Sequence, residues 1–189
     1  MLDLINTVDF RHGEAREETL RNANELIAWM RGAGLVDSRS AAKLAGWARS
    51  REKEAGALLA EIHDIRELAA RLVEAVIDRV DPGARDLARL NELARECDER
   101  RIEWTGNRYS LALRSAGDCA VWIRHLIVGS VTGLLTSGDM RRVARCQDDR
   151  GCGWLFIDNS RAGNRRWCSM SDCGNRAKAR SFARRGRRS

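Results

Sequence analysis

The 189-residue sequence contains a single proline, and aromatic residues make up only 5% of it. This composition is typical of a mainly helical chain. No apolar run approaches the roughly 18 residues that a membrane-spanning helix requires. The opening MLDLINTVDF places Asp3 and Asp9 where a signal peptide would have its basic and apolar regions. We therefore expect a cytoplasmic protein that has no membrane partner.

The net charge of +7 is unevenly distributed along the chain. Residues 141–189 hold fourteen Lys and Arg against four Asp and Glu, whereas residues 1–140 hold twenty against twenty-three. This asymmetry divides the chain into a mildly acidic body (1–140) and a strongly basic C-terminal module (141–189). Basic modules attract polyanions, of which nucleic acid is the commonest. A solvated charged tail would have the same composition.

Apolar residues recur at helical spacing through most of the body. The spacing predicts helices with apolar faces along 20–30, 44–48, 58–76 and 87–94. Either Ser38 or Ser40 is expected to cap the second of them. The opening LDLINTVDF fits a strand or the first turn of a helix.

Two later stretches of the body differ from this pattern. Residues 101–115 alternate in polarity on both sides of Thr105-Gly106-Asn107, which predicts a β-hairpin. Residues 118–139 are apolar on most faces, which predicts a buried central helix. The predicted fold class is therefore mainly α, with an α-helical N-terminal domain that includes a β-hairpin.

The basic module holds four of the six cysteines in one short window. Their spacing is C-x5-C, then fifteen residues, then C-x4-C, and they are Cys146, Cys152, Cys168 and Cys173. Structural zinc sites take four tetrahedral thiolates, which two close pairs can supply. A module of under 50 residues with few apolar groups usually needs such a metal, or a disulfide, to fold. We predict one structural Zn²⁺, with a redox dithiol as the less favoured alternative because no C-x-x-C is present.

The segment between the two cysteine pairs suggests how they meet. It is predicted to form a strand, a turn at Arg161-Ala162-Gly163-Asn164 and a return strand, with a small core of Trp154, Phe156 and Trp167. Zinc with four thiolates has a formal charge of −2, which nearby cations could offset. The candidates are Arg165, Arg166, Arg176 and Lys178. Cys97 and Cys119 lie in helical patterns and are expected to be ordinary buried thiols.

The run CGWLFIDNSRAGNRRWCSMSDCGNRAKAR resembles the CGNR zinc finger, whose name matches Cys173-Gly174-Asn175-Arg176 here. The N-terminal LDLINTVDFR and the stretch LIAWMRGAGL resemble the ABATE domain that usually precedes this finger. The resemblance implies zinc, DNA binding and a place among bacterial stress-induced transcriptional regulators, and it implies no catalytic residues. The family's first pair is usually C-x4-C, so Gly151 is expected to absorb one extra residue in a longer turn.

A C-terminal helix is expected to follow the last two ligands, as in treble-clef-like fingers. Helical spacing places Arg176, Arg180, Arg184 and Arg187 along one stripe, while Phe182 is expected to pack on the finger. Arginine suits phosphate contacts and guanine recognition. The predicted nucleic-acid contacts are Arg165, Arg166, Arg176, Lys178, Arg180, Arg184 and Arg185. A solvated face that balances the charge of the metal site is the alternative.

The role of the body is less determined. Polar residues in its opening either line a pocket or pin the amino terminus, and they are Asn6, Thr7, Asp9, Arg11 and His12. No nucleophile–base pair is evident, so we expect no enzyme. The preferred hypothesis is a zinc-dependent DNA-binding transcription regulator whose body binds a small-molecule effector or forms a homodimer. The alternatives are a zinc-stabilised protein-interaction module without DNA binding, and an enzyme with an appended finger.

Overall fold

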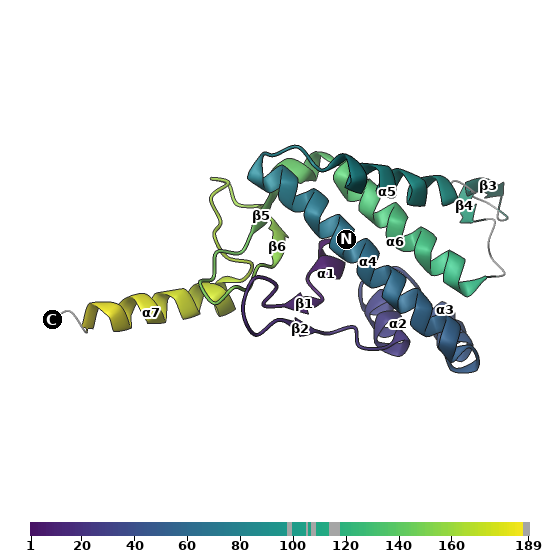
Figure 1. Ribbon diagram of the computed structural model, residues 1–189, viewed down its shortest axis with the longest axis horizontal. Coiled ribbons are helices and arrows are strands. Elements are labelled where there is room, and N and C mark those ends of the chain that lie inside the picture. Colours follow the sequence, from purple (N-terminus) through teal and green to yellow (C-terminus); the bar gives the residue numbers. More distant parts are fainter. Residues whose placement is uncertain (98–99, 105, 107–108, 114–117, 187–189) are drawn as a thin grey trace.

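The computed structural model describes residues 1–97, 100–104, 106, 109–113 and 118–186. These form a helical body with a cysteine-bearing lobe (residues 141–186) at one end, from which a last helix projects (Figure 1). The helices of the body are α1 (Leu2–Ile5), α2 (Ala23–Gly32), α3 (Ser38–Ser50), α4 (Glu52–Asp78), α5 (Ala84–Glu96) and α6 (Cys119–Leu135). The predicted mainly α fold class is confirmed. No helix in the described ranges is long and apolar enough to cross a membrane.

Helix α4 is the centre of the body. It contacts α1, α2, α3, α5 and α6, and Figure 1 shows α2 and α3 on one side of it and α5 and α6 on the other. Ile62, Leu72 and Val73 of α4 are at most 3% exposed. The helix predicted within 118–139 is α6, and its Ile123 and Ile127 are buried in the same core. Its predicted central position is wrong, because α4 contacts more of the other helices. Burial of these side chains is the main term that stabilises the body.

The helix ends follow local capping chemistry. Helix α2 ends at Gly32, shortly after the apolar face predicted along 20–30. The cap predicted for α3 at Ser38 or Ser40 is wrong, because Asp37 is the N-cap and its Oδ1 accepts from the Ser40 amide at 2.7 Å. Aspartate is among the strongest N-cap residues, so it takes the position ahead of both serines.

The predicted β-hairpin is confirmed. Strands β3 (Arg100–Trp104) and β4 (Tyr109–Leu113) pair antiparallel. Of the predicted turn, Gly106 has a φ of +73°, whereas Thr105 and Asn107 lie outside the described residues. Glycine adopts this left-handed conformation without strain.

The opening of the chain is the short helix α1, followed by β1 (Val8–Asp9) and β2 (Glu17–Glu18), which pair antiparallel. Glu18 receives two bonds from the guanidinium of Arg66 in α4, at 2.9 and 2.5 Å. Arg66 also donates to the Thr7 hydroxyl at 2.9 Å. The Arg66 side chain is only 3% exposed, so the charge that α4 buries here is paired rather than isolated.

The lobe contains a short hairpin and the C-terminal helix. Its elements are η1 (Gly138–Arg142), β5 (Val143–Arg145), β6 (Leu155–Ile157), η2 (Met170–Gly174) and α7 (Asn175–Gly186). The return strand predicted before Trp167 is wrong, because β6 pairs with β5 instead. Val143 and Leu155 of this hairpin are buried in the core of the body. Packing therefore continues across the predicted boundary between residues 140 and 141. The division into two domains stays a prediction.

Candidate metal centre and basic helix

The four cysteines of the lobe come from two structural features. Cys146 follows β5 and Cys152 precedes β6, so both lie in the turn of the hairpin, while Cys168 and Cys173 lie before and within η2 at the root of α7. Their four Sγ atoms all lie within 4.8 Å of one another. The Sγ of Cys168 is 3.8 Å from that of Cys152 and 3.7 Å from that of Cys173. Zinc–thiolate bonds of about 2.3 Å in a tetrahedron give sulfur–sulfur edges of about 3.8 Å, so the cluster fits zinc.

The pKa values of the clustered thiols also favour the binding of a cation. The thiol of Cys152 donates to Cys146 and lowers the pKa of Cys146 to about 5. Burial, together with the negative charge on Cys146, raises the pKa of Cys168 to about 12. One thiolate thus opposes the ionisation of its neighbours. A bound divalent cation removes this conflict and allows all four thiols to ionise.

The turn between Cys146 and Cys152 depends on glycine. Gly151 has a φ of +81°, as expected for the residue that accommodates a longer first loop, and Gly153 has a φ of +68°. The Cys146 amide donates to the Trp154 carbonyl at 2.8 Å, which closes the hairpin next to the metal site. These positive φ values favour glycine over any residue with a side chain.

The predicted small core of Trp154, Phe156 and Trp167 is confirmed. Phe156 is buried with Cys146, Cys152 and Cys173, and Trp154 and Trp167 pack against this cluster. The guanidinium of Arg165 lies 4.6 Å from the centroid of the Phe156 ring. This small core surrounds the thiols and excludes water from one side of them.

Asp148 is the main acidic residue at the root of α7, and sequence reasoning missed it. Its side chain is 0% exposed and accepts from Arg150 Nη2 at 3.0 Å and from Arg180 Nη2 at 2.7 Å. Arg176 Nη2 lies 3.6 Å from the same carboxylate. Burial disfavours the Asp148 carboxylate, but the bonds from Arg150 and Arg180 outweigh burial and hold its pKa well below its usual range. The unusual density of acids in QDDRG, next to a ligand, is the only sequence signal for this role.

Two of the predicted charge-balancing arginines lie against the metal ligands. Arg176 donates to the Cys173 Sγ at 3.1 Å and pairs with Asp172. Arg165 donates to the backbone carbonyls of Trp167 and Cys168. Both guanidinium groups therefore place positive charge beside the thiol cluster, as predicted.

Two of the four arginines in the predicted stripe on α7 are held by carboxylates, and the other two lie outside the described side chains. Arg176 and Arg180 face the carboxylates of the lobe, and their side chains are only 34% and 30% exposed. Lys178 is exposed, and it makes no ion pair within the described ranges. The side chains of Arg184 and Arg185, and all of Arg187, lie outside the described residues.

Arg166 and Phe182 both lie on the surface of the lobe. Arg166 is exposed, and its Nε donates to the amide oxygen of Gln147 at 2.8 Å. Phe182 was expected to pack on the finger, but it is 79% exposed. The prediction for Phe182 is therefore wrong, and Figure 1 shows that α7 projects away from the helical body.

The amino terminus is joined to the metal-binding lobe. The Asn6 side chain bonds the Leu155 backbone in both directions, donating to its carbonyl and accepting from its amide, each at 2.8 Å. The Thr7 hydroxyl donates to the Leu4 carbonyl at 2.7 Å. Of the two interpretations of this polar stretch, the structure favours the one in which Asn6 and Thr7 pin the amino terminus.

A second contact seals this junction beside Cys152. The Arg11 amide donates to the Cys152 carbonyl at 3.3 Å, and the His12 amide donates to the Gly151 carbonyl at 3.2 Å. A Cβ on Gly13 would lie 2.5 Å from the Arg150 carbonyl oxygen, so only glycine allows this approach. His12 is exposed, and its Nε2 lies 3.0 Å from the Glu74 carboxylate of α4.

Comparison with known families agrees with this architecture. Residues 1–146 match the ABATE model, described as "Putative stress-induced transcription regulator". The chain belongs to the ABATE family. Residues 142–186 match the CGNR zinc finger, a segment that contains all four clustered cysteines. A search of curated proteins finds no match.

The two family matches confirm the resemblances seen in the sequence. The ABATE match covers the helical body, and the finger match covers the lobe. Together with the convergence of the four Sγ atoms, the finger match identifies a site for one structural zinc ion. A shell of four thiolates leaves no open coordination position, so this zinc holds structure rather than activating water.

Proposed function

We propose that this ABATE-family protein is a zinc-dependent regulator that binds duplex DNA through its C-terminal lobe. The observation that carries the proposal is the position of Cys173, which lies in the turn that leads directly into the basic helix α7. A metal bound there fixes the root of α7 relative to the hairpin. Residues 141–189, with ten more basic than acidic residues, then form a cationic end on a mildly acidic body.

The proposed contacts are mainly electrostatic. Exposed cations that neutralise phosphates release counterions, so affinity should fall steeply as salt rises. Lys178 on α7 is one such cation, and Arg184 and Arg185 follow it along the helix. The body would then transmit a signal, either from a small-molecule effector or through a homodimer. We assign the protein no catalytic activity and place it in the cytoplasm.

A titration against mixed genomic duplex fragments tests the proposal. Zinc-loaded protein would be titrated at about 50 mM and about 200 mM salt, where a protein that makes several phosphate contacts loses orders of magnitude in affinity. Binding that weakens with salt supports the proposal. Absence of binding by protein that contains one zinc per chain would exclude it.

A protein-interaction module is the second candidate function. The observation that favours it is the exposure of two apolar side chains, Phe182 at 79% and Met170 at 47%. A protein partner could cover these two side chains. In that case Phe182→Ser would weaken a protein complex while nucleic-acid affinity stayed negligible at every salt concentration.

A further inference from the structure

The arginines at the root of α7 are paired with carboxylates. The turn and the helix bring three arginines against three aspartates, so their charges cancel within this cluster. The members are Arg150, Arg176 and Arg180, and Asp148, Asp149 and Asp172. Because Asp148 is fully buried, the arginines that hold it cannot turn toward a phosphate without leaving a buried charge unpaired.

Unpaired cations lie instead along strand β5. Arg79, Arg141 and Arg161 are exposed, and within the described ranges they make no ion pair and no side-chain hydrogen bond. Arg79 lies at the end of α4, Arg141 in η1 and Arg161 in the loop after β6. Three segments far apart in sequence thus present free guanidinium groups around the same short strand.

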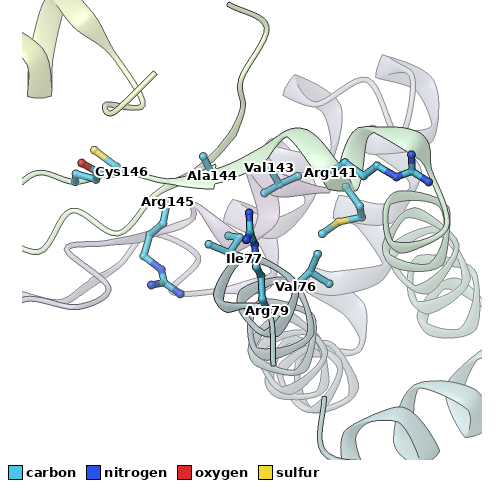
Figure 2. A pocket seen from close by; sticks show the side chains of 10 residues that line it. Val76, Ile77, Arg79, Arg141, Val143, Ala144, Arg145 and Cys146 are labelled. Atoms are coloured by element: carbon cyan, nitrogen blue, oxygen red, sulfur yellow. The ribbon is translucent and has the colours of Figure 1, made fainter. Parts of the chain in front are cut away.

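These arginines line two adjoining pockets. The first, of about 640 Å³, contains Arg79 and Arg141 (Figure 2), and the second, of about 550 Å³, contains Arg141 and Arg161. The two pockets share four lining residues, so they are neighbours along β5, and we call the two together the β5 trough. The shared residues are Arg141, Val143, Ala144 and Gln147.

The only acid among the residues that line the β5 trough is Asp158. Its carboxylate already accepts from the amides of Ser160 and Arg165, each at 2.8 Å. These two amide donors, and the nearby Arg165 guanidinium, offset part of the charge of the Asp158 carboxylate. The trough therefore has a net positive charge, whereas the charges at the root of α7 cancel.

Other arginines near the trough have partners of their own. Arg145 pairs with Asp78 at 2.9 Å and lies 3.8 Å from Glu74. Arg142 donates to the Asp158 carbonyl and lies 3.9 Å from Asp139. The side chains of Arg165 and Arg166 bond only neutral oxygens, so they add to the local charge.

We propose that the β5 trough, with Arg79, Arg141 and Arg161, is the surface of this protein that binds the phosphates of duplex DNA. This assignment rests on the proposed DNA-binding function and places the main contacts away from Arg176 and Arg180. Guanidinium groups bind phosphate oxygens in a planar, paired geometry that unpaired arginines can adopt. Lys178 of α7 adds a further exposed cation to the same lobe.

The test compares two triple variants with the same change in net charge. The first is Arg79→Gln/Arg141→Gln/Arg161→Gln. The control is Arg31→Gln/Arg39→Gln/Arg49→Gln, at exposed positions on α2 and α3 that make no ion pair within the described ranges. Both would be zinc-loaded and titrated against mixed duplex fragments over a range of salt. A third protein, Arg79→Lys/Arg141→Lys/Arg161→Lys, keeps the charge of the trough and controls for the folding of the lobe.

We expect the trough variant to bind more weakly and its salt dependence (the slope of log affinity against log salt) to fall by about 3, because three phosphate contacts are lost. The control and the lysine variant should keep a slope close to that of the wild type. Wild-type affinity in the trough variant, or equal losses in both glutamine variants, would overturn the assignment and leave DNA binding itself intact. A wild type that binds no DNA would overturn both proposals.

Discussion

Asp148 and Arg180 are joined across the lobe by a 2.7 Å bond between the carboxylate Oδ1 and the guanidinium Nη2. Asp148 lies in the turn between Cys146 and Cys152, whereas Arg180 lies in α7. The Asp148 side chain is fully buried. The orientation of the basic helix is therefore set by a buried ion pair as well as by the cysteines at its root.

Asp148→Asn should destabilise the lobe. The substitution removes the charge that Arg150 and Arg180 surround, and loss of such charged hydrogen bonds costs about 2 kcal/mol. We expect the unfolding temperature of the zinc-loaded chain to fall by about 4–8 °C in calorimetry. Asp149→Asn is the matched control, since Asp149 also pairs with Arg180 but is 51% exposed. Exposed ion pairs contribute under about 1 kcal/mol to stability. Equal effects of the two substitutions would therefore contradict the stabilising role given to the buried pair of Asp148 and Arg180.

Gly13→Ala should loosen the junction between the amino terminus and the metal-binding turn. The new methyl group would lie 2.5 Å from the Arg150 carbonyl oxygen, so the two segments must separate. Overpacking of this kind costs about 1–3 kcal/mol, measurable by urea unfolding. Gly46→Ala in α3 provides the opposite case, because no atom lies within 4 Å of its added Cβ. There we expect a gain of about 0.5–1 kcal/mol from higher helix propensity; a loss at Gly46, or none at Gly13, would refute the packing argument.

The ion pair between Glu18 and Arg66 should make the body sensitive to acid. Burial raises the pKa of Glu18, but the hydrogen bonds from Arg66 outweigh it, so the net pKa lies below 4.5. A depressed carboxyl pKa stabilises the fold fully above the unfolded value and loses that contribution as pH falls through the folded value. The stability difference between wild type and Glu18→Gln should therefore be about 2 kcal/mol at neutral pH and shrink below about pH 4.5.

Urea unfolding at a series of pH values measures that difference. Glu17→Gln is the control, because Glu17 is exposed on the same strand and makes no ion pair in the described part of the chain. Zinc release at low pH affects wild type and variants alike, so the comparison between them remains valid. A Glu18→Gln difference that stays constant from about pH 7 to about pH 3.5 would show that this pair does not titrate as described.

Cys168→Ser should abolish stoichiometric zinc binding. Serine replaces a thiolate that zinc prefers with a weak oxygen ligand, and three thiolates hold the metal far less tightly than four. Elemental analysis should find about one zinc per chain in the wild type and well under half of that in the variant. Cys119→Ser changes a thiol outside the cluster and should leave the zinc content unchanged. Full zinc content in Cys168→Ser would remove Cys168 from the ligand set.

Helices and metal ligands were predictable because their signals are local. The apolar spacing over 58–76 indicates a helix, and α4 spans Glu52–Asp78. The pairing of cysteines at short spacing likewise indicates a metal site before any contact is known, and all four Sγ atoms converge. Each signal depends on residues within a few positions of one another.

Apart from the cap of α3, the main errors concern partners that local spacing does not indicate. Arg180 lies on the predicted stripe of α7, but its partner Asp148 is 32 residues away, and periodicity contains no information about that pairing. Strand β6 has only three residues, too few to indicate which neighbour it joins, and it pairs with β5 rather than with the segment that follows it. The β5 trough was also missed, because Arg79, Arg141 and Arg161 come from separate segments that are placed around β5 only in the folded chain.

The zinc dependence of DNA affinity tests the central claim most directly. The affinity of the full chain for duplex fragments would be measured zinc-loaded, after removal of the metal by a chelator under reducing conditions, and after one equivalent of zinc is restored. We predict that binding is lost with the metal and returns with it, because zinc holds the hairpin and the root of α7 in one arrangement. Equal affinity of the metal-free and zinc-loaded chains would contradict the account.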